Sequence, residues 1–189
     1  MAQFFHFNEL TNTFINLLSS VNIKILQYIP KTCRIFIMDE NILADLVNVP
    51  ILTELSPQEL NIIAPYWHYV FLQPSDILFS EGDPADGLYY VLEGEFIIYK
   101  NNDGAIPLEL THVKQHQFFG EQAVLENSYR SGTLQASEAS RILMISNDGF
   151  YEILEKYPHI GVILLKGIAR YLSLQLRKTT GQYVAIFER

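Results

Sequence analysis

The chain has 189 residues, a hydrophobic fraction of 49%, a charged fraction of 18% and a formal net charge of −8. These values exclude a disordered chain and are typical of one globular domain with appendages. Duplex binding gains most of its affinity from Lys and Arg on phosphates, so the acidic balance predicts no nucleic-acid partner. The single cysteine, Cys33, excludes an internal disulfide framework and a cysteine-cluster metal site. It fits a reducing compartment, and we expect a cytoplasmic location.

The first 38 residues are apolar, with a helical recurrence of Leu10, Phe14, Leu17, Leu18 and Val21. We expect an amphipathic helix that packs on the domain or on another subunit. A membrane-surface helix is the alternative, but its polar face normally carries many Lys and Arg side chains. Only Lys24 precedes Lys31 here, and no run of about 18 mainly apolar residues could span a membrane. We therefore expect no membrane partner.

Two short helices and a series of strands follow. Residues 41–49 can form one helix, and the capping box Ser56-Pro57-Gln58-Glu59 begins another that ends near Ala64. Short apolar runs separated by turn residues then recur at intervals typical of an all-β barrel or jelly roll. The expected strands cover residues 67–72, 76–80, 88–92, 95–100, 107–113, 133–137 and 141–145.

Residues 118–133 combine groups that suit a sugar phosphate. Aromatic residues end a strand, Gly120 forms the corner, and residues 121–126 can form a short helix. A turn of this kind presents free backbone N–H groups to an anion. Arg130 adds a planar guanidinium suited to phosphate, and the carboxylate of Glu121 suits paired hydroxyls such as a ribose edge.

This stretch resembles the phosphate-binding cassette of cyclic nucleotide-binding domains, as found in protein kinase regulatory subunits and catabolite activators. The shared pattern is Phe-Gly-Glu, Ala two residues later, Arg nine residues after the Glu, then two small residues and Thr. The resemblance extends from about Asp39 to Arg177. It implies that Glu121 binds the ribose 2′-hydroxyl, that Arg130 binds the cyclic phosphate, and that nearby backbone N–H groups complete the cradle. The implied ligand-binding residues of the cassette are Phe119, Gly120, Glu121, Gln122, Ala123, Arg130, Ser131 and Thr133. Two positions depart from the common pattern, Gln122 for an aliphatic residue and Tyr129 for Pro.

Helical periodicity returns at the end of the chain. Asp148 is the expected cap of a helix over residues 149–156, Pro158 opens a longer helix to about Lys178, and Gly181 is expected to break it. One broad apolar stripe on the long helix comprises Leu164, Leu165, Ile168, Tyr171, Leu172 and Leu176. In the family this helix covers the base as a lid, and in catabolite-activator-like proteins it also dimerises. Gln175 is the best polar candidate for a base contact.

We predict a mainly β fold with flanking helices: a jelly roll, or double-stranded β-helix barrel, with N-terminal helices and a C-terminal lid or dimerisation helix. The expected parts are an apolar helical segment at 1–38, the barrel at 39–147, and the C-terminal helices at 148–189. His112 and His116 lie on or after a strand, where that spacing separates them by roughly 13 Å, too far to share a metal ion. No nucleophile elbow, Walker loop or zincin motif is present.

The missing motifs predict a binding module without enzymatic activity, metal or cofactor. The resemblance implies that it is a sensor of a cyclic nucleotide, with cAMP as the first expected ligand and cGMP as the second. Ser131 follows Arg130, where cGMP-preferring relatives often have Thr, but some cAMP receptors also have Ser. A homodimer or a protein partner is expected to contact the terminal helices. Two alternatives stay open. One is a dimer scaffold that binds no nucleotide. The other is the sensor of a catabolite-activator-type transcription regulator, for whose DNA-binding domain we expect no room before Arg189.

Overall fold

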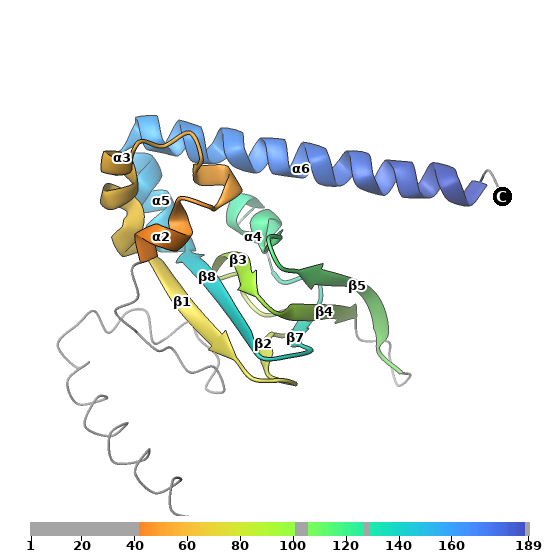
Figure 1. Ribbon diagram of the computed structural model, residues 1–189. Coiled ribbons are helices and arrows are strands. Elements are labelled where there is room, and N and C mark those ends of the chain that lie inside the picture. The colour runs from red at the N-terminus through yellow and green to blue at the C-terminus, as the bar shows by residue number, and fades with distance from the viewer. Residues whose placement is uncertain (1–41, 101–105, 127–128, 188–189) are drawn as a thin grey trace, which may run out of the picture. The chain divides into compact units, whose positions relative to one another are not determined.

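The computed structural model describes residues 42–100, 106–126 and 129–187, which all belong to one compact unit. The predicted segment at 1–38 lies outside the described residues. The described part contains two four-stranded antiparallel sheets with helices beside them (Figure 1). The prediction of a mainly β fold with flanking helices is confirmed.

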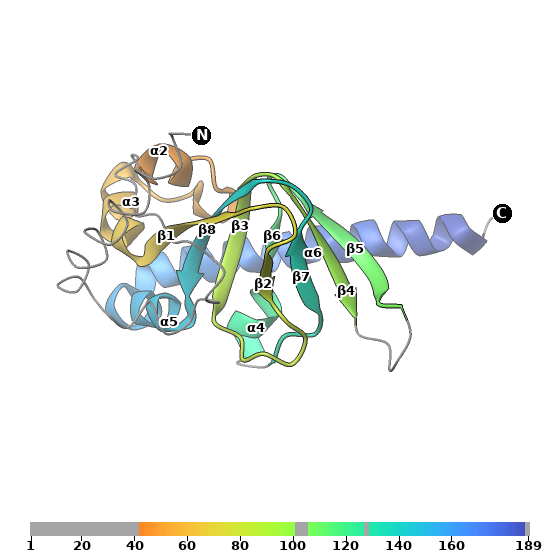
Figure 2. The ribbon, with the colours of Figure 1, turned by 90° about the horizontal axis from the view of Figure 1, so that it is seen from below.

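The first sheet has the strand order β1-β8-β3-β6, and the second has the order β2-β7-β4-β5. Figure 2 shows the two sheets from below, with α4 at the end of the barrel where the loop before β3 also lies. The strands are β1 (Trp67–Leu72), β2 (Ile77–Phe79), β3 (Gly87–Glu93), β4 (Glu95–Lys100), β5 (Leu108–Lys114), β6 (Phe118–Phe119), β7 (Thr133–Ala136) and β8 (Ser140–Ser146). Each predicted strand is present, with its ends shifted by at most one residue.

Alternate side chains of the two sheets fill the barrel interior. Residues on one face of a strand recur with a period of two, so Val70 and Leu72 of β1 point inward together. They pack with apolar side chains from the other strands, including Phe96 of β4, Leu134 of β7 and Ile142 of β8. This dry interior fixes the strand register and therefore the positions of the loops at each end of the barrel.

A second apolar core lies between the first sheet and the helices. The elements that contribute are α2 (Ile42–Leu46), η3 (Pro50–Leu52), α3 (Pro57–Ile63), η4 (Ala64–Tyr66), α5 (Asn147–Lys156) and α6 (Pro158–Phe187). The predicted capping box begins α3: Glu59 N–H donates to Ser56 Oγ at 3.3 Å, and Ser56 N–H donates to Glu59 Oε2 at 2.8 Å. Caps of this kind stabilise a helix by about 1 kcal/mol.

Two predictions about the C-terminal helices are wrong. Asp148 does not cap α5; Ser146 does, and its hydroxyl accepts from Gly149 N–H at 3.1 Å. Gly181 does not break α6, which continues to Phe187. A single glycine inside a helix costs only about 1 kcal/mol relative to Ala, which is too little to end a helix by itself.

The apolar stripe of α6 is buried only in its first part. Leu164 and Ile168 are buried, Tyr171 and Leu172 are half-buried, and Leu165 and Leu176 are exposed. Figure 1 shows α6 passing α5 and continuing beyond the strands. Among the described residues, no helix has both the length and the apolar character needed to cross a membrane.

Candidate functional site

A cavity of about 730 Å³ opens between the second sheet, the segment around α4 (Glu121–Glu126) and α6. Its size is within the usual range for a small-molecule site, roughly 300–1,000 Å³. Side chains from four regions line it: Phe79 and Ile98, residues 110–113, residues 117–122 with Glu126 and 129–132, and on α6 Tyr171, Gln175, Lys178 and Thr179.

The backbone of Arg130 is held by the loop that precedes β3. Arg130 N–H donates to the carbonyl of Asp83 at 2.8 Å, and Gly82 N–H donates to the carbonyl of Arg130 at 2.9 Å. Pro84 and Tyr129 form an isolated bridge between the same two segments. These contacts fix the direction in which the Arg130 side chain leaves the loop, although 44 residues separate it from its ionic partner, Asp86.

The guanidinium of Arg130 is buried, with 4% of the residue exposed, yet only one of its three nitrogen atoms has a hydrogen-bond partner among the described residues. Nη2 donates to the carboxylate of Asp86 and, at 3.1 Å, to the carbonyl of Gly87. Cζ lies 4.1 Å from the centre of the Phe79 ring, a cation–π contact. Nε and Nη1 have no hydrogen-bond partner within the part of the chain that the structure describes. Buried donors are nearly always paired, so these two atoms mark a place for an acceptor.

Gly120 allows the chain to pass close to this guanidinium. Its φ of +80° is in the left-handed region that side chains other than glycine rarely adopt. A Cβ atom here would lie 2.6 Å from Nη1 of Arg130 and 2.8 Å from the carbonyl oxygen of Gly87. Both the backbone conformation and the close approach therefore require glycine at this corner.

Glu121 places a carboxyl group in the same cavity as Arg130. Burial raises the pKa of Glu121, while a backbone hydrogen bond and the charge of Arg130 oppose that rise. The carboxyl group has no ion pair among those found in the described residues. Arg130 and Glu121 therefore place a cationic donor group and a carboxyl acceptor in one cavity, as a molecule with both an anion and hydroxyl groups requires, and Lys178 and Glu126 also line it.

The opposite wall of the cavity belongs to α6. Tyr171 is half-buried there, and its ring meets Phe118 edge-on with centroids 5.1 Å apart. Burial raises the pKa of Tyr171, and polar contacts with the backbone of Phe118 and the side chain of Gln175 oppose that rise. Gln175 and Lys178 extend the same wall by one further helical turn.

The sequence model of the cyclic nucleotide-binding domain family matches residues 69–157 of this chain. Residues 69–157 belong to the cyclic nucleotide-binding domain family. The matched range contains most of β1, all of β2 to β8, α4, and the residues that hold Arg130 and Gly120 in place.

Curated relatives of this cyclic nucleotide-binding domain occur in larger proteins. The chain is 30% identical over 109 residues to a cAMP-dependent protein kinase regulatory subunit of Yarrowia lipolytica, covering 58% of this chain and 28% of that protein. It is 29% identical over 145 residues to the potassium channel GORK of Arabidopsis thaliana, covering 76% of this chain and 17% of that protein. The chain thus spans less than a third of the length of these relatives.

Solved structures show the same fold. A cyclic nucleotide-binding domain from Methylobacillus flagellatus matches with a TM-score of 0.72 and 19% identity, over 82% of this chain and 89% of that one. The N-terminal domain of a transcriptional regulator from Streptomyces coelicolor matches with a TM-score of 0.59 and 27% identity, over 71% and 93%. The predicted jelly-roll architecture is confirmed by these similarities.

Most of the residues predicted from the cassette line the cavity of the cyclic nucleotide-binding domain. They are Phe119, Gly120, Glu121, Gln122, Arg130, Ser131 and, from α6, Gln175. Thr133 is not among the lining residues: it is buried, and its hydroxyl accepts from Glu81 N–H at 3.0 Å. Ala123 lies on α4, and its side chain is outside the described part.

Sequence reasoning missed Asp86 and Tyr171. Asp86 lies in the turn before β3, and its carboxylate joins Arg130 to Tyr89, whose hydroxyl donates to Oδ2 at 2.8 Å. No local pattern shows this pairing, because it depends on the meeting of two distant loops. Tyr171 belongs to the apolar stripe predicted for the long helix, and that pattern gives no indication of a role for its hydroxyl.

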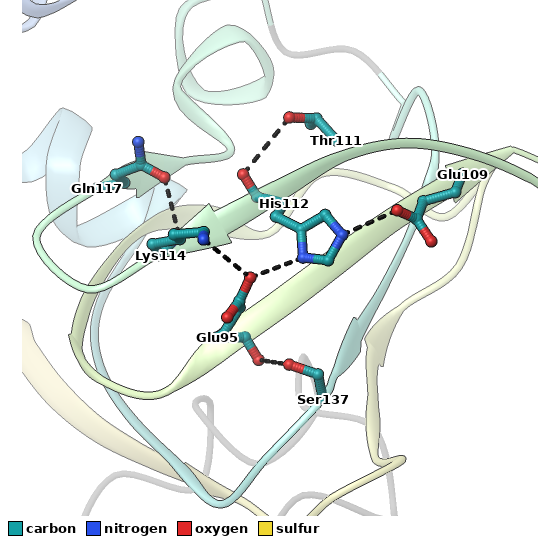
Figure 3. A network of polar contacts seen from close by, with 7 residues as sticks. All are labelled: Glu95, Glu109, Thr111, His112, Lys114, Gln117 and Ser137. Atoms are coloured by element: carbon teal, nitrogen blue, oxygen red, sulfur yellow. Dashed lines mark hydrogen bonds and ion pairs between the residues drawn. The ribbon is translucent and has the colours of Figure 1, made fainter.

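The two histidines considered for metal binding have other partners. Figure 3 shows His112 between Glu95 and Glu109, with Nδ1 2.7 Å from Glu95 Oε1 and Nε2 2.8 Å from Glu109 Oε1. These two carboxylates raise the pKa of His112, with Glu109 contributing the larger effect. His116 Nδ1 lies 3.1 Å from the hydroxyl of Tyr90. In the described ranges, no group of three or more His, Cys, Asp and Glu residues could hold a metal ion.

Proposed function

We propose that this protein is a sensor that binds a 3′,5′-cyclic nucleotide in the cavity between the cassette and α6. The observation that supports this most strongly is the buried guanidinium of Arg130, two of whose nitrogen atoms have no hydrogen-bond partner among the described residues. The family match over residues 69–157 indicates the class of ligand that would pair with them. The cyclic phosphate accepts from Nε and Nη1, while Asp86 keeps Nη2 occupied and holds the fork in place. Charge-assisted bonds of this kind are roughly twice as strong as neutral ones.

In this proposal the carboxylate of Glu121 accepts a hydrogen bond from the ribose 2′-hydroxyl. It lies in the same cavity as Arg130, so one bound sugar phosphate can reach both groups. Phe119, Gln122, Ala123 and Ser131 contribute backbone or wall contacts around the phosphate and ribose. The base then extends toward α6, where Gln175 is the proposed polar contact.

We propose cAMP as the first ligand, because several relatives carry the name cAMP-dependent protein kinase regulatory subunit. cGMP is the second candidate, since the hydroxyl of Ser131 could reach a guanine amino group. The proposed action is regulatory and not catalytic. Binding shifts α6, and with it contacts to a second copy or to a protein partner. A ligand can produce that shift only by its difference in affinity for the two arrangements.

Calorimetric titration with cAMP and cGMP, with 5′-AMP as the control, tests the proposal. We expect a dissociation constant in the micromolar range or tighter for one cyclic nucleotide and much weaker binding of 5′-AMP. Absence of heat with both cyclic nucleotides would instead favour the scaffold that binds no nucleotide.

A second context for the same binding function is the sensor of a transcription regulator. The 27% identity to the Streptomyces coelicolor domain, over 93% of that chain, favours it. An immunoblot of the native protein in its host distinguishes the contexts: a species clearly larger than 21.7 kDa supports a sensor within a larger regulator. A species of that mass argues against this context.

A further inference from the structure

The phenol of Tyr171 forms an unusual contact with the backbone of Phe118. Its hydroxyl donates to the carbonyl of Phe118 at 3.0 Å and accepts from the N–H of the same residue at 3.1 Å. The Phe118 backbone therefore engages the single donor of the phenol and one of its acceptor positions.

The position of Phe118 explains why a side chain is needed there. Phe118 lies on β6, which is the edge strand of its sheet and pairs only with β3 in the described part of the chain. In an antiparallel pair, every second residue of a strand directs its N–H and C=O away from its neighbour. Gln117 bonds to Val91 of β3, so the backbone groups of Phe118 face outward. The hydroxyl of Tyr171 occupies the place of the next strand and satisfies both groups.

Tyr171 also marks the end of the buried part of α6. Ile160, Leu164 and Ile168 are each at most 3% exposed, whereas Leu174 and Leu176 are 58% and 69% exposed. Beyond Leu172, Gln175 is the only described side chain of α6 that is half-buried, and the others are exposed. Tyr171 is therefore the last of the described α6 side chains that forms a hydrogen bond to the barrel.

On the other side of this contact is the ligand cavity. Phe118 lies two residues before Gly120 and three before Glu121, and β6 is too short to move independently of them. Any displacement of this corner changes the position of the Phe118 backbone groups relative to Tyr171. Any displacement of α6 at Tyr171 leaves two backbone groups of an edge strand without a partner.

We propose that the Tyr171 hydroxyl is a latch that joins α6 to the cassette, so that the positions of Gly120 and Glu121 and the position of the exposed half of α6 are linked. The regulatory part of this inference rests on the proposed nucleotide binding. Linkage is reciprocal, so a nucleotide that moves the cassette shifts α6, and a partner that holds α6 changes nucleotide affinity by the same factor.

Tyr171→Phe tests the latch, because it keeps the ring and its contact with Phe118 and removes only the hydroxyl. Tyr151→Phe is the matched control: its hydroxyl donates to the carbonyl of Val124 on α4 at 2.8 Å, so it loses a bond to the cassette from α5 instead of α6. In ligand-free protein, the Phe118 amide is expected to exchange with deuterium about 2- to 10-fold faster in Tyr171→Phe than in wild type or the control. An unchanged rate would overturn the latch whether or not the protein binds nucleotide.

With saturating nucleotide, we expect slower amide exchange over residues 172–181 in wild type and in Tyr151→Phe, and little response of these residues in Tyr171→Phe. The coupling would be contradicted if nucleotide slowed amide exchange over residues 172–181 as much in Tyr171→Phe as in wild type. It would also be contradicted if nucleotide left this exchange unchanged in wild type. If wild type binds neither cAMP nor cGMP, the proposed function fails. In that case the Phe118 amide rate alone decides whether Tyr171 holds the edge strand.

Discussion

Replacing Arg130 and Asp86 together, as Arg130→Gln with Asp86→Asn, removes the cation from the cavity without leaving a buried charge unpaired. The Asp86 side chain is 10% exposed, so substitution of Arg130 alone would leave the buried carboxylate of Asp86 without its ion-pair partner. Breaking a buried pair in this way costs about 3–5 kcal/mol of stability. The paired substitution leaves two neutral amides that can hydrogen-bond to each other. It therefore separates an effect on binding from an effect on folding.

The expected loss of affinity follows from the two free nitrogen atoms of Arg130. Each hydrogen bond to a charged group contributes about 1.5–3 kcal/mol, so the loss of two corresponds to roughly 3–6 kcal/mol, or about 100-fold or more in affinity. Calorimetric titration with cAMP measures the affinity, and urea unfolding measures the stability of each variant. Arg141→Gln is the control, because Arg141 pairs with Asp45 and Glu93, and none of these three residues lines the cavity. A folded double variant whose affinity stays within about threefold of wild type would refute the role of Arg130.

Three further substitutions test other parts of the account. Burial raises the pKa of Glu121, so the folded protein favours the protonated, neutral side chain. The stability that this protonation contributes is lost as the pH rises through the raised pKa. Glu121→Gln is therefore expected to stabilise the ligand-free protein at neutral pH, which urea unfolding measures. The same substitution is expected to weaken cAMP binding, and a variant that binds cAMP with wild-type affinity would contradict the role of Glu121 at the ribose. In wild type, cAMP affinity should fall as the pH drops through the same pKa, and a pH-independent affinity in titrations would count against Glu121. Gly120→Ala would force alanine into a left-handed conformation and place its Cβ atom 2.6 Å from Arg130 Nη1. Urea unfolding should therefore show that the free energy of unfolding falls by at least about 1–2 kcal/mol, and an unchanged value would show that this corner does not require glycine. Gly167→Ala would place a Cβ atom 2.8 Å from the backbone of Ile51 and push α6 from η3, so amide exchange over α6 should accelerate; unchanged exchange would show that this close packing is not required.

The local features of the fold could be predicted from the sequence because local residues determine them. Ser56 and Glu59 are three positions apart, and their capping box needs nothing beyond its own turn. The end of β1 is followed by Pro74, and the end of β4 by an Asn-Asn-Asp-Gly run, for the same reason. The prediction of a break at Gly181 failed because a propensity of about 1 kcal/mol is small compared with the cooperative hydrogen bonding of a long helix.

The site could be predicted only in part. Gly120, Glu121 and Arg130 lie within one continuous segment, so their spacing and chemistry could be recognised together. Asp86 and Tyr171 reach the same site from 44 residues before Arg130 and 53 residues after Phe118, through contacts that exist only after the barrel and α6 have packed. A carboxylate in a turn and a tyrosine in an apolar stripe each have an adequate local explanation, so the sequence alone gives no reason to pair them with the cassette.

The most direct test of the central claim is an NMR titration of the Arg130 Nε–H resonance with cAMP and, separately, with cGMP. This donor is buried and has no hydrogen-bond partner among the described residues. A cyclic phosphate on the guanidinium should move the resonance strongly, with saturation at the same nucleotide concentration as the calorimetric heat. A resonance that stays in place while either nucleotide binds elsewhere, or that responds to neither nucleotide, would contradict the assignment of this cavity as the cyclic nucleotide site.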